Sequence, residues 1–362
     1  MRDMPKQEDS YQQFVRHIDR DNNMSLVRYL LAIGVMIAHF NILCGADISW
    51  FVTSYEVVCG FFVLSGFLLV YPILRGKPIK KYLVDRAWRL LPSYICIVLL
   101  CAITFCFVST LSIKDYFFSI DFWKYLAANL TSLNFLHPTL PGVFTGMAND
   151  AVNGSLWTIK IEWQLSVTIP FVILFLRKFN FRFRQSILLI FVLSIAYKLF
   201  LLYRYSTTGS EIYLILGRQF VGQLIYFYSG VMLYTYYDSI LHHLKRWLLP
   251  AIFIFLTFKF VGDGFYYHNL IYPFVLSIII VSLSLIPHDM ATRYIDGGHN
   301  ISYEIYLCHY PVFQLLAYYH VKAAIGIIPT LLLGFALTIA LAVLIYVSVG
   351  NLYLKRKMRS YT

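Results

Sequence analysis

The sequence predicts an all-α, polytopic transmembrane helical bundle with about ten spans and both termini in the cytoplasm. Three observations lead to this prediction: the high apolar content, the length of the apolar runs, and the uneven distribution of basic residues. Of 362 residues, 59% are hydrophobic and only 13% are charged, and the mean hydropathy is +0.66. This charged fraction is about half of the usual one, so much of the apolar surface is expected to face lipid.

Apolar runs of roughly 18 to 25 residues recur along the chain, and a helix needs this length to cross about 30 Å of hydrocarbon. The predicted spans are residues 26–44, 50–74, 90–110, 156–176, 185–203, 213–237, 248–262, 269–286, 301–320 and 328–350. Together they form one membrane domain, 25–352, between a polar N-terminal tail, 1–24, and a basic C-terminal tail, 353–362. The N-terminal tail lacks the apolar core of a cleavable signal peptide, so the first span is expected to serve as an uncleaved signal.

Lysine and arginine residues gather in alternate loops. The side that carries both termini holds 22 of them, whereas the opposite loops hold four, namely Lys114, Lys124, Arg204 and Lys322. The positive-inside rule therefore predicts cytoplasmic termini, in a cell membrane crossed several times. The same rule explains the net charge of +12 without a nucleic-acid partner. The long segment 111–155 becomes an extracytoplasmic loop, and loops of this length are often functional.

The six cysteines all lie within apolar runs, without CxxC or zinc-like spacing. Buried free thiols are expected, rather than a disulfide framework or a metal site.

Two ionisable residues mark the first predicted span. Arg28 and His39 are eleven residues apart, which places them on one helix face, about 16 Å apart along the axis. Charged groups at membrane depth are expensive and often functional. The alternative is structural: an arginine that reaches the interface and a histidine bonded to a neighbouring carbonyl.

Arg86 and Arg89 stand three residues apart at the start of the third span, so they share a helix face. Arginine forks match phosphate oxygens, and the pair could form a seat for a polyanion. The alternative is that both arginines only orient the span.

Glu162 lies about six residues into the fourth span, at about the depth expected for His39. A carboxylate beside a histidine would orient the ring and raise its basicity. The alternative is an ion pair between Glu162 and Lys160 or Lys198.

In the ninth span, Tyr303, Tyr306 and His309 recur every three residues, so they lie on a broad common face. This face is either functional or an interfacial aromatic belt with a core histidine.

Five motifs, which follow the family's order along the chain, resemble the acyltransferase-3 family of membrane O-acyltransferases. Arg28 and His39 match its Arg-x10-His pattern, and Arg86 and Arg89 match its RxxR pattern. The remaining matches are FFVLSGFL, with Ser65 and Gly66, then N-x-SLW…E, with Asn153, Trp157 and Glu162, and SYxIYLxHxP, with Tyr303, Tyr306 and His309.

One departure concerns the acidic residue that family members often carry before FFVLSG. Cys59 occupies that position here, and Glu56 lies three residues earlier on the same face, where it could substitute. Within the motif itself, Ser65 and Gly66 resemble a site of close helix packing more than a nucleophile.

The resemblance implies transfer of an acyl group, most often acetyl, from cytoplasmic acetyl-CoA to a hydroxyl of an extracytoplasmic or lipid-linked carbohydrate. Arg28, Arg86 and Arg89 would then hold the phosphates of coenzyme A. His39 would act as a general base or carry the acyl group, with Glu162 beside it. Acetyl-CoA is expected as a co-substrate, and no permanently bound cofactor is expected. The alternative function is export of a polysaccharide or a lipid-linked sugar, for which a coenzyme A seat has no use.

Overall fold

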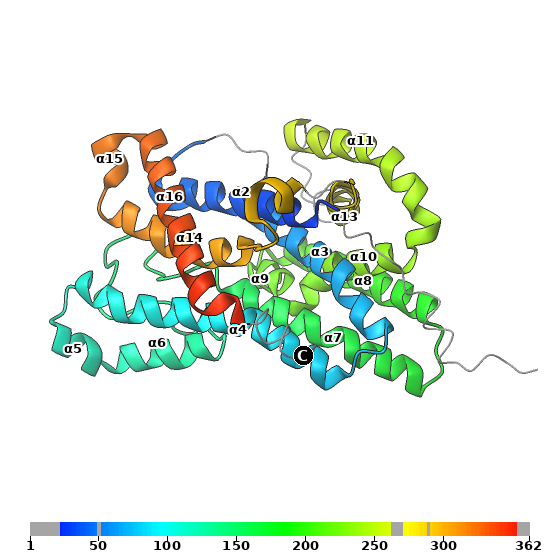
Figure 1. Ribbon diagram of the computed structural model, residues 1–362, viewed down its shortest axis with the longest axis horizontal. Helices are drawn as coiled ribbons and strands as arrows, with labels where there is room; N and C mark the ends of the chain where they lie inside the picture. The colour runs from blue at the N-terminus through cyan, green and yellow to red at the C-terminus, as the bar shows by residue number, and fades with distance from the viewer. Residues whose placement is uncertain (1–21, 49–51, 262–270, 288–289, 353–362) are drawn as a thin grey trace, which may run out of the picture. The chain divides into compact units, whose positions relative to one another are not determined.

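The computed structural model describes residues 22–48, 52–261, 271–287 and 290–352, and these residues form helices without any β-strand. The predicted tails therefore lie outside the described residues, apart from 22–24 (Figure 1). The helices that bear on the site are α2 (Met24–Cys44), α3 (Ser54–Leu74), α4 (Ile79–Thr104), α5 (Ile113–Phe118), α6 (Ile120–Leu130), α7 (Trp157–Lys178), α14 (Ser302–Tyr318) and α16 (Ile327–Ile345). The others are α8 (Phe183–Thr208), α9 (Ile212–Arg218), α10 (Phe220–Thr235), α11 (Tyr237–Val261), α13 (Tyr272–Ser284) and α15 (Val321–Ile325).

Six helical segments of the described residues are long and apolar enough to cross a membrane. They are Met24–Cys44, Ser54–Leu74, Ile79–Phe107, Trp157–Lys178, Phe183–Thr208 and Ile327–Gly350. The other four predicted spans also contain helix, in α9 with α10, α11, α13 and α14. These four do not meet the same length and hydropathy criterion; α13, for example, has only 13 residues.

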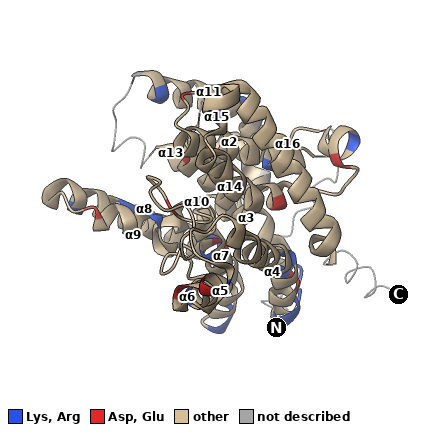
Figure 2. Ribbon diagram, turned by 90° about the vertical axis from the view of Figure 1, so that its left-hand side faces the viewer, with Lys and Arg blue, Asp and Glu red and all other residues tan. Residues whose placement is uncertain are grey.

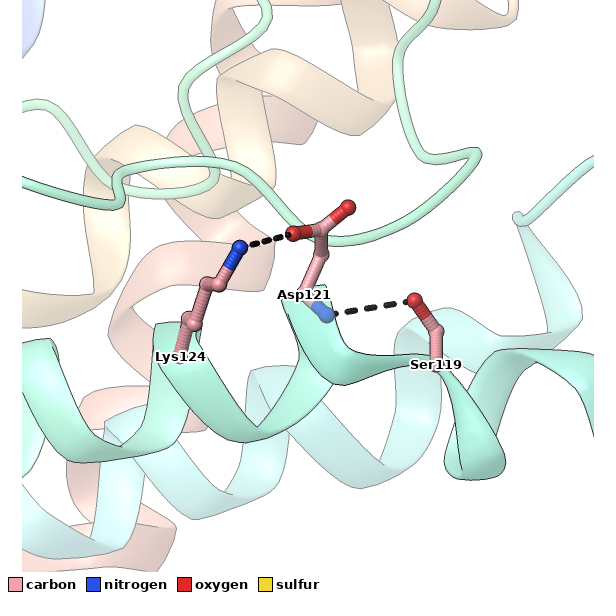
Figure 3. Close-up of polar contacts among 3 residues, drawn as sticks. All are labelled: Ser119, Asp121 and Lys124. Atoms are coloured by element: carbon pink, nitrogen blue, oxygen red, sulfur yellow. Dashed lines mark hydrogen bonds and ion pairs between the residues drawn. The ribbon is translucent and has the colours of Figure 1, made fainter.

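Two predicted segments differ from the structure in detail. The segment 213–237 is not one helix, because Gln219 is extended (φ −79°, ψ 173°) and separates α9 from α10. The segment 111–155 is not only an irregular loop, because it contains α5 and α6. Ser112 begins α5 by accepting a hydrogen bond from the backbone N–H of Asp115. Ser119 begins α6 in the same way, by accepting from the backbone N–H of Asp121 (Figure 3). Such caps are a local signal that hydropathy does not capture.

The first of two compact units contains the described residues up to Leu31, 55–83 and those from 161 to 297. In this unit α3 and α10 touch backbone to backbone. A Cβ on Gly66 would lie 1.9 Å from the Phe227 carbonyl oxygen, and one on Gly230 would lie 2.0 Å from that of Val63. The glycine of FFVLSGFL is therefore a packing residue, as its sequence context predicted.

The second unit contains the described residues of 32–54, 84–160 and those from 298 onward. Here α14 and α16 pack closely, and a Cβ on Gly334 would lie 2.3 Å from the Phe313 ring. Within the same unit, α6 returns alongside α4 after the short helix α5 (Figure 1). The Tyr116 hydroxyl donates to the Ala102 carbonyl (2.8 Å), and the Tyr94 hydroxyl donates to the Asn129 carbonyl (2.6 Å).

Candidate active site

His39 and His309 form a pair in the second unit. Nδ1 of His39, on α2, lies 2.7 Å from Nε2 of His309, on α14, so one nitrogen donates a hydrogen bond to the other. The rings are stacked, with centroids 5.0 Å apart and an angle of 12° between their planes. His309 is fully buried, and its Nδ1 makes no hydrogen bond within the described part of the chain. The bond to His39 thus orients the His309 ring together with the packing around it.

Aromatic side chains surround the histidine pair. The Tyr310 ring meets His39 edge-on at 5.2 Å, and Tyr306 lies 5.6 Å from His309. Phe313 lies one turn beyond His309 and contacts both His309 and Phe40. An imidazole in this apolar setting is favoured in its neutral form, which is the form that can accept a proton or attack a carbonyl.

The Asn153–Trp157 motif positions the start of α7 against α14. Asn153 donates to the Leu307 carbonyl (2.9 Å) and accepts hydrogen bonds from the backbone N–H and the hydroxyl of Ser155. A Cβ on Gly154 would lie 2.7 Å from the Tyr310 ring, so only glycine permits this approach. The motif therefore supports the aromatic wall beside His39, and Asn153 acts through packing and hydrogen bonds.

Tyr306 and Tyr303 also join helices. The Tyr306 hydroxyl lies 2.7 Å from that of Thr158 and 3.1 Å from the Ser155 carbonyl, and its side chain is only 6% exposed. The Tyr303 hydroxyl donates to the Leu90 carbonyl on α4 (2.9 Å). Tyr303, Tyr306 and His309 thus contact three different segments, which are α4, the start of α7 and α2, respectively.

Arg86 and Arg89 lie half-buried on the first half of α4, where Figure 2 shows the basic positions in blue. Arg89 is close enough to Glu304 for an electrostatic interaction. Glu304 is fully buried, and its Oε1 accepts a hydrogen bond from the Ser93 hydroxyl (2.8 Å). Arg89 therefore lies within electrostatic reach of an acidic residue of α14, which the sequence analysis did not include.

Arg28 and Glu162 belong to the first unit. Arg28 is half-buried in the first half of α2, eleven residues before His39. Glu162 is half-buried on α7, and the Ser65 hydroxyl lies 3.4 Å from its Oε1. The proximity of Glu162 to His39 stays a prediction.

The two lysines considered as partners of Glu162 have other contacts. Lys160 lies over the Phe135 ring at 4.3 Å, and the buried Lys198 donates to the Tyr55 hydroxyl at 3.5 Å. Lys160 and Glu162 are two residues apart on one helix, a spacing at which side chains do not face each other. The pairing of Glu162 with either lysine stays a prediction.

Glu56, suggested as a substitute for the missing acidic residue, has a partner of its own. Both of its carboxylate oxygens accept hydrogen bonds from Nζ of Lys259, at 2.8 and 2.9 Å. The Cys59 thiol lies 3.6 Å from Oε1 of Gln223. The polar cluster around Cys59 therefore joins α3 to α10 and α11 inside the first unit.

Sequence reasoning missed Glu304, Ser93 and Tyr310. Glu304 is the variable residue of the SYxIYL motif, and an acidic residue inside an apolar run was the one signal that could have drawn attention to it.

Among the described residues, no group of three or more potential ligands could hold a metal ion. The candidate site of the second unit therefore consists of the imidazole pair, the buried hydrogen bonds of Asn153 and Tyr306, and the basic side chains of Arg86 and Arg89.

Fold and site define a class of protein: a multi-pass, all-α membrane protein with a histidine pair between two of its helices. A family model described as an acyltransferase domain matches residues 21–347. The chain therefore belongs to the acyltransferase-3 family. Nodulation protein 10 of Rhizobium leguminosarum bv. viciae is 25% identical over 163 residues, which cover 42% of this chain and 44% of that protein. No solved structure matches the chain.

Proposed function

We propose that this protein is an O-acyltransferase of the cytoplasmic membrane. It moves an acyl group, in the first instance acetyl, from cytoplasmic acyl-CoA to a hydroxyl of an extracytoplasmic or lipid-linked carbohydrate. The family membership supports acyl transfer. The observation that carries the site assignment is the 2.7 Å contact between His39 and His309, since each residue belongs to a different family motif.

The hydrogen bond between the histidines is compatible with two tautomers, and only one is productive. When Nδ1 of His39 carries the proton and donates it to Nε2 of His309, Nε2 of His39 keeps its lone pair. In the opposite arrangement, His39 holds a proton on Nε2 and cannot act there. His309 thus serves as a positioning residue, which accepts the Nδ1 hydrogen bond and stabilises the imidazolium that forms during turnover.

The lone pair on Nε2 can serve either of two routes. As a general base, it takes the proton of the acceptor hydroxyl while the oxygen attacks the thioester carbonyl. The C–S bond then breaks, and the coenzyme A thiolate leaves with the proton returned by the imidazolium. As a nucleophile, Nε2 first displaces the thiolate to form an acyl-imidazole. The hydroxyl then attacks this intermediate, and its proton passes to the thiolate. Both routes require the same tautomer.

The donor seat in this proposal consists of Arg28, Arg86 and Arg89 at the cytoplasmic ends of α2 and α4. Arginine pairs well with the phosphates of coenzyme A. The proposal includes ten spans with both termini in the cytoplasm. The positive-inside rule then supports the cytoplasmic side as the position of the donor seat. Glu162 acts on the outer side of the bilayer, by orienting either the imidazole or the acceptor.

The test uses the surface glycans of a deletion strain. Alkali-labile acyl groups are measured in that strain and in strains complemented with the wild-type gene or with His39→Ala at equal protein levels. The proposal expects acyl groups to return with the wild type alone. Equal acyl content in all three strains, or loss of the glycan itself in the deletion strain, would refute it; the second outcome is the signature of an exporter.

A further inference from the structure

The turn between α7 and α8 is short and strongly basic. Residues 177–184 contain four basic residues and no acidic one: Arg177, Lys178, Arg182 and Arg184. Asn180 adopts the left-handed conformation (φ 56°) that asparagine often takes just after a helix. The Phe181 N–H then donates to the Leu176 carbonyl (3.0 Å). This local motif reverses the chain, so α7 ends at Lys178 and α8 already begins at Phe183.

The position of this turn in the membrane follows from the two helices that it joins. Both Trp157–Lys178 and Phe183–Thr208 are long and apolar enough to cross a bilayer. A connection of four residues between two consecutive spans lies at a membrane surface, where water can satisfy the polar groups of the helix ends. The positive-inside rule predicts that this surface is the cytoplasmic one. The basic turn therefore lies at the level of lipid headgroups.

An open groove of about 620 Å³ lies between the end of α7 and the start of α8, inside the first unit. Its lining side chains are apolar apart from Lys178 and Ser186, and they include Phe171, Phe175 and Leu189. Phe171 and Lys178 are seven residues apart, so the groove extends about 10 Å from the turn along α7. Its volume is in the range of roughly 300–1,000 Å³ that is typical of ligand sites, and its walls suit an acyl chain.

Positive charge lies at the turn end of this groove. Nζ of Lys178 lies over the Phe179 ring at 5.7 Å. Arg182 adjoins the groove, because its carbonyl accepts the hydroxyl of the lining residue Ser186 (3.0 Å). Lys178 and Arg182 are both exposed, and within the described part of the chain neither forms an ion pair with a carboxylate. Two cations at one end of an apolar groove complement a ligand with an anionic head and an apolar tail.

Three exposed aromatic rings accompany the charges. The centroid of Phe175 lies 4.7 Å from that of Phe179 and 6.1 Å from that of Phe181. Aromatic and basic side chains together are typical of a segment that lies in the headgroup region. Basic residues that only orient a span need neither a groove nor an aromatic cluster beside them.

We propose that this groove binds an anionic phospholipid, with one acyl chain between α7 and α8 and the phosphate at Lys178 and Arg182. Arginine and lysine both bind phosphate oxygens, and basic pockets between spans on the cytoplasmic side are known to bind acidic lipid headgroups. The occupant is a lipid and not a protein segment, because the groove follows two spans from the headgroup level into the region of the acyl chains.

The test uses the full chain, unaltered, in vesicles that contain a trace of phospholipid with a photoreactive diazirine in its acyl chain. The headgroup is either phosphatidylglycerol or phosphatidylcholine at equal mole fraction, and cross-linked peptides from 171–190 are quantified by mass spectrometry. Labelling of α16 serves as the internal reference. Phosphatidylglycerol should label 171–190 about tenfold or more above phosphatidylcholine, because each basic side chain near the headgroups raises binding about fivefold. This preference should shrink at about 1 M salt.

A paired set of charge variants assigns the preference to the groove. Lys178→Gln with Arg182→Gln should reduce phosphatidylglycerol labelling to the level of phosphatidylcholine. The matched control is Lys80→Gln with Lys81→Gln, which removes the same charge from the exposed first turn of α4 and should keep the preference. A preference that survives in the first variant, or that both variants lose equally, would overturn the proposal.

A second pair tests the acyl chain. Leu189→Trp fills the groove and should reduce labelling of 171–190, whereas Leu188→Trp, exposed but outside the groove, should not. Equal labelling of the wild type by both headgroups would also overturn the proposal, as would absence of any label, which would identify a protein partner or a second copy on the groove. The wild-type comparison needs no variant, so it decides the proposal even where a substitution disturbs folding. None of these readouts depends on acyl transfer, so the lipid site and the proposed function can fail independently.

Discussion

At the scale of single residues, the half-buried contact between His39 and His309 engages Nδ1 of His39 and leaves Nε2 outside that contact. An imidazole has two ring nitrogens, and a partner on one of them sets the state of the other. His309 provides that partner from α14, and Tyr310 limits the motion of the His39 ring from the side. The geometry thus gives the His39 ring a defined orientation among neighbouring rings.

The two arginines of α4 are expected to respond differently to substitution. Arg86→Ala should raise the apparent KM for acyl-CoA by about tenfold or more, because a charge-assisted contact with phosphate contributes roughly 1.5–3 kcal/mol. Arg89→Ala should do the same and also lower thermal stability, because it leaves the buried Glu304 carboxylate without its nearby guanidinium. Donor kinetics and detergent-solubilised melting curves check both expectations.

The double variant Arg89→Ala with Glu304→Gln separates the two roles of Arg89. It should regain the melting temperature of the wild type while its donor KM stays high. Recovery of both properties would mean that Arg89 serves only to neutralise Glu304. An unchanged KM in Arg86→Ala and in the double variant would show that these arginines are orientation signals and not a donor seat.

Glu162 is expected to be needed for turnover and not for donor binding. Glu162→Gln keeps the shape and removes the charge, so turnover should fall about 10²-fold or more if the carboxylate orients a base. The double variant Glu162→Gln with Lys160→Gln is the matched comparison, measured as acetyl transfer in membranes at equal protein amounts. Restored activity in the double variant would contradict the catalytic role and favour a simple ion pair.

The candidate site residues were predictable from sequence where they form motifs, and their partners were not. His39 stands out as an ionisable residue in an apolar run. His309 stands 270 positions later, and only the folded chain shows that it meets His39. The same is true of the electrostatic interaction between Arg89 and Glu304, because proximity between α4 and α14 depends on helix rotation, which hydropathy does not encode.

At the scale of helices, close packing through glycine holds α3 against α10. Gly66→Ala would place a methyl group where the Phe227 carbonyl oxygen now lies, so the helices would have to separate. We expect a loss of about 1–3 kcal/mol in stability, seen as a lower melting temperature in detergent. The neighbouring Ser65→Ala is the control and should have little effect on melting, since its 3.4 Å contact with Glu162 is long. Wild-type melting of Gly66→Ala would show that the two helices do not need this contact.

Helix positions were predicted better than helix interruptions. Every predicted span overlaps a helix, because long apolar runs specify a helix in lipid regardless of the details. The break at Gln219 and the helices α5 and α6 were missed for local reasons. A serine cap and a short amphipathic stretch act over one or two turns, below the window in which hydropathy is averaged.

At the scale of the whole molecule, the distribution of basic residues predicts a single orientation in the membrane. Both termini should be cytoplasmic, since 22 of the basic residues fall on their side. Single cysteines at position 5 and position 360, probed in intact cells with a membrane-impermeant thiol reagent, should remain unlabelled until the cells are opened, whereas one at Thr145 should react at once. Labelling of either terminus in intact cells would contradict the ten-span arrangement.

The most direct test of the account is acyl transfer by purified protein in vesicles, with labelled acetyl-CoA on the cytoplasmic side and a glycan acceptor on the other. His39→Ala should lose label transfer by about 10²–10⁴-fold while its melting temperature and yield stay close to those of the wild type. His309→Gln, which keeps a hydrogen-bond acceptor for Nδ1, should fall between the two, and the exposed His243→Ala should behave as the wild type. Transfer at the wild-type rate by a well-folded His39→Ala protein would contradict the central claim.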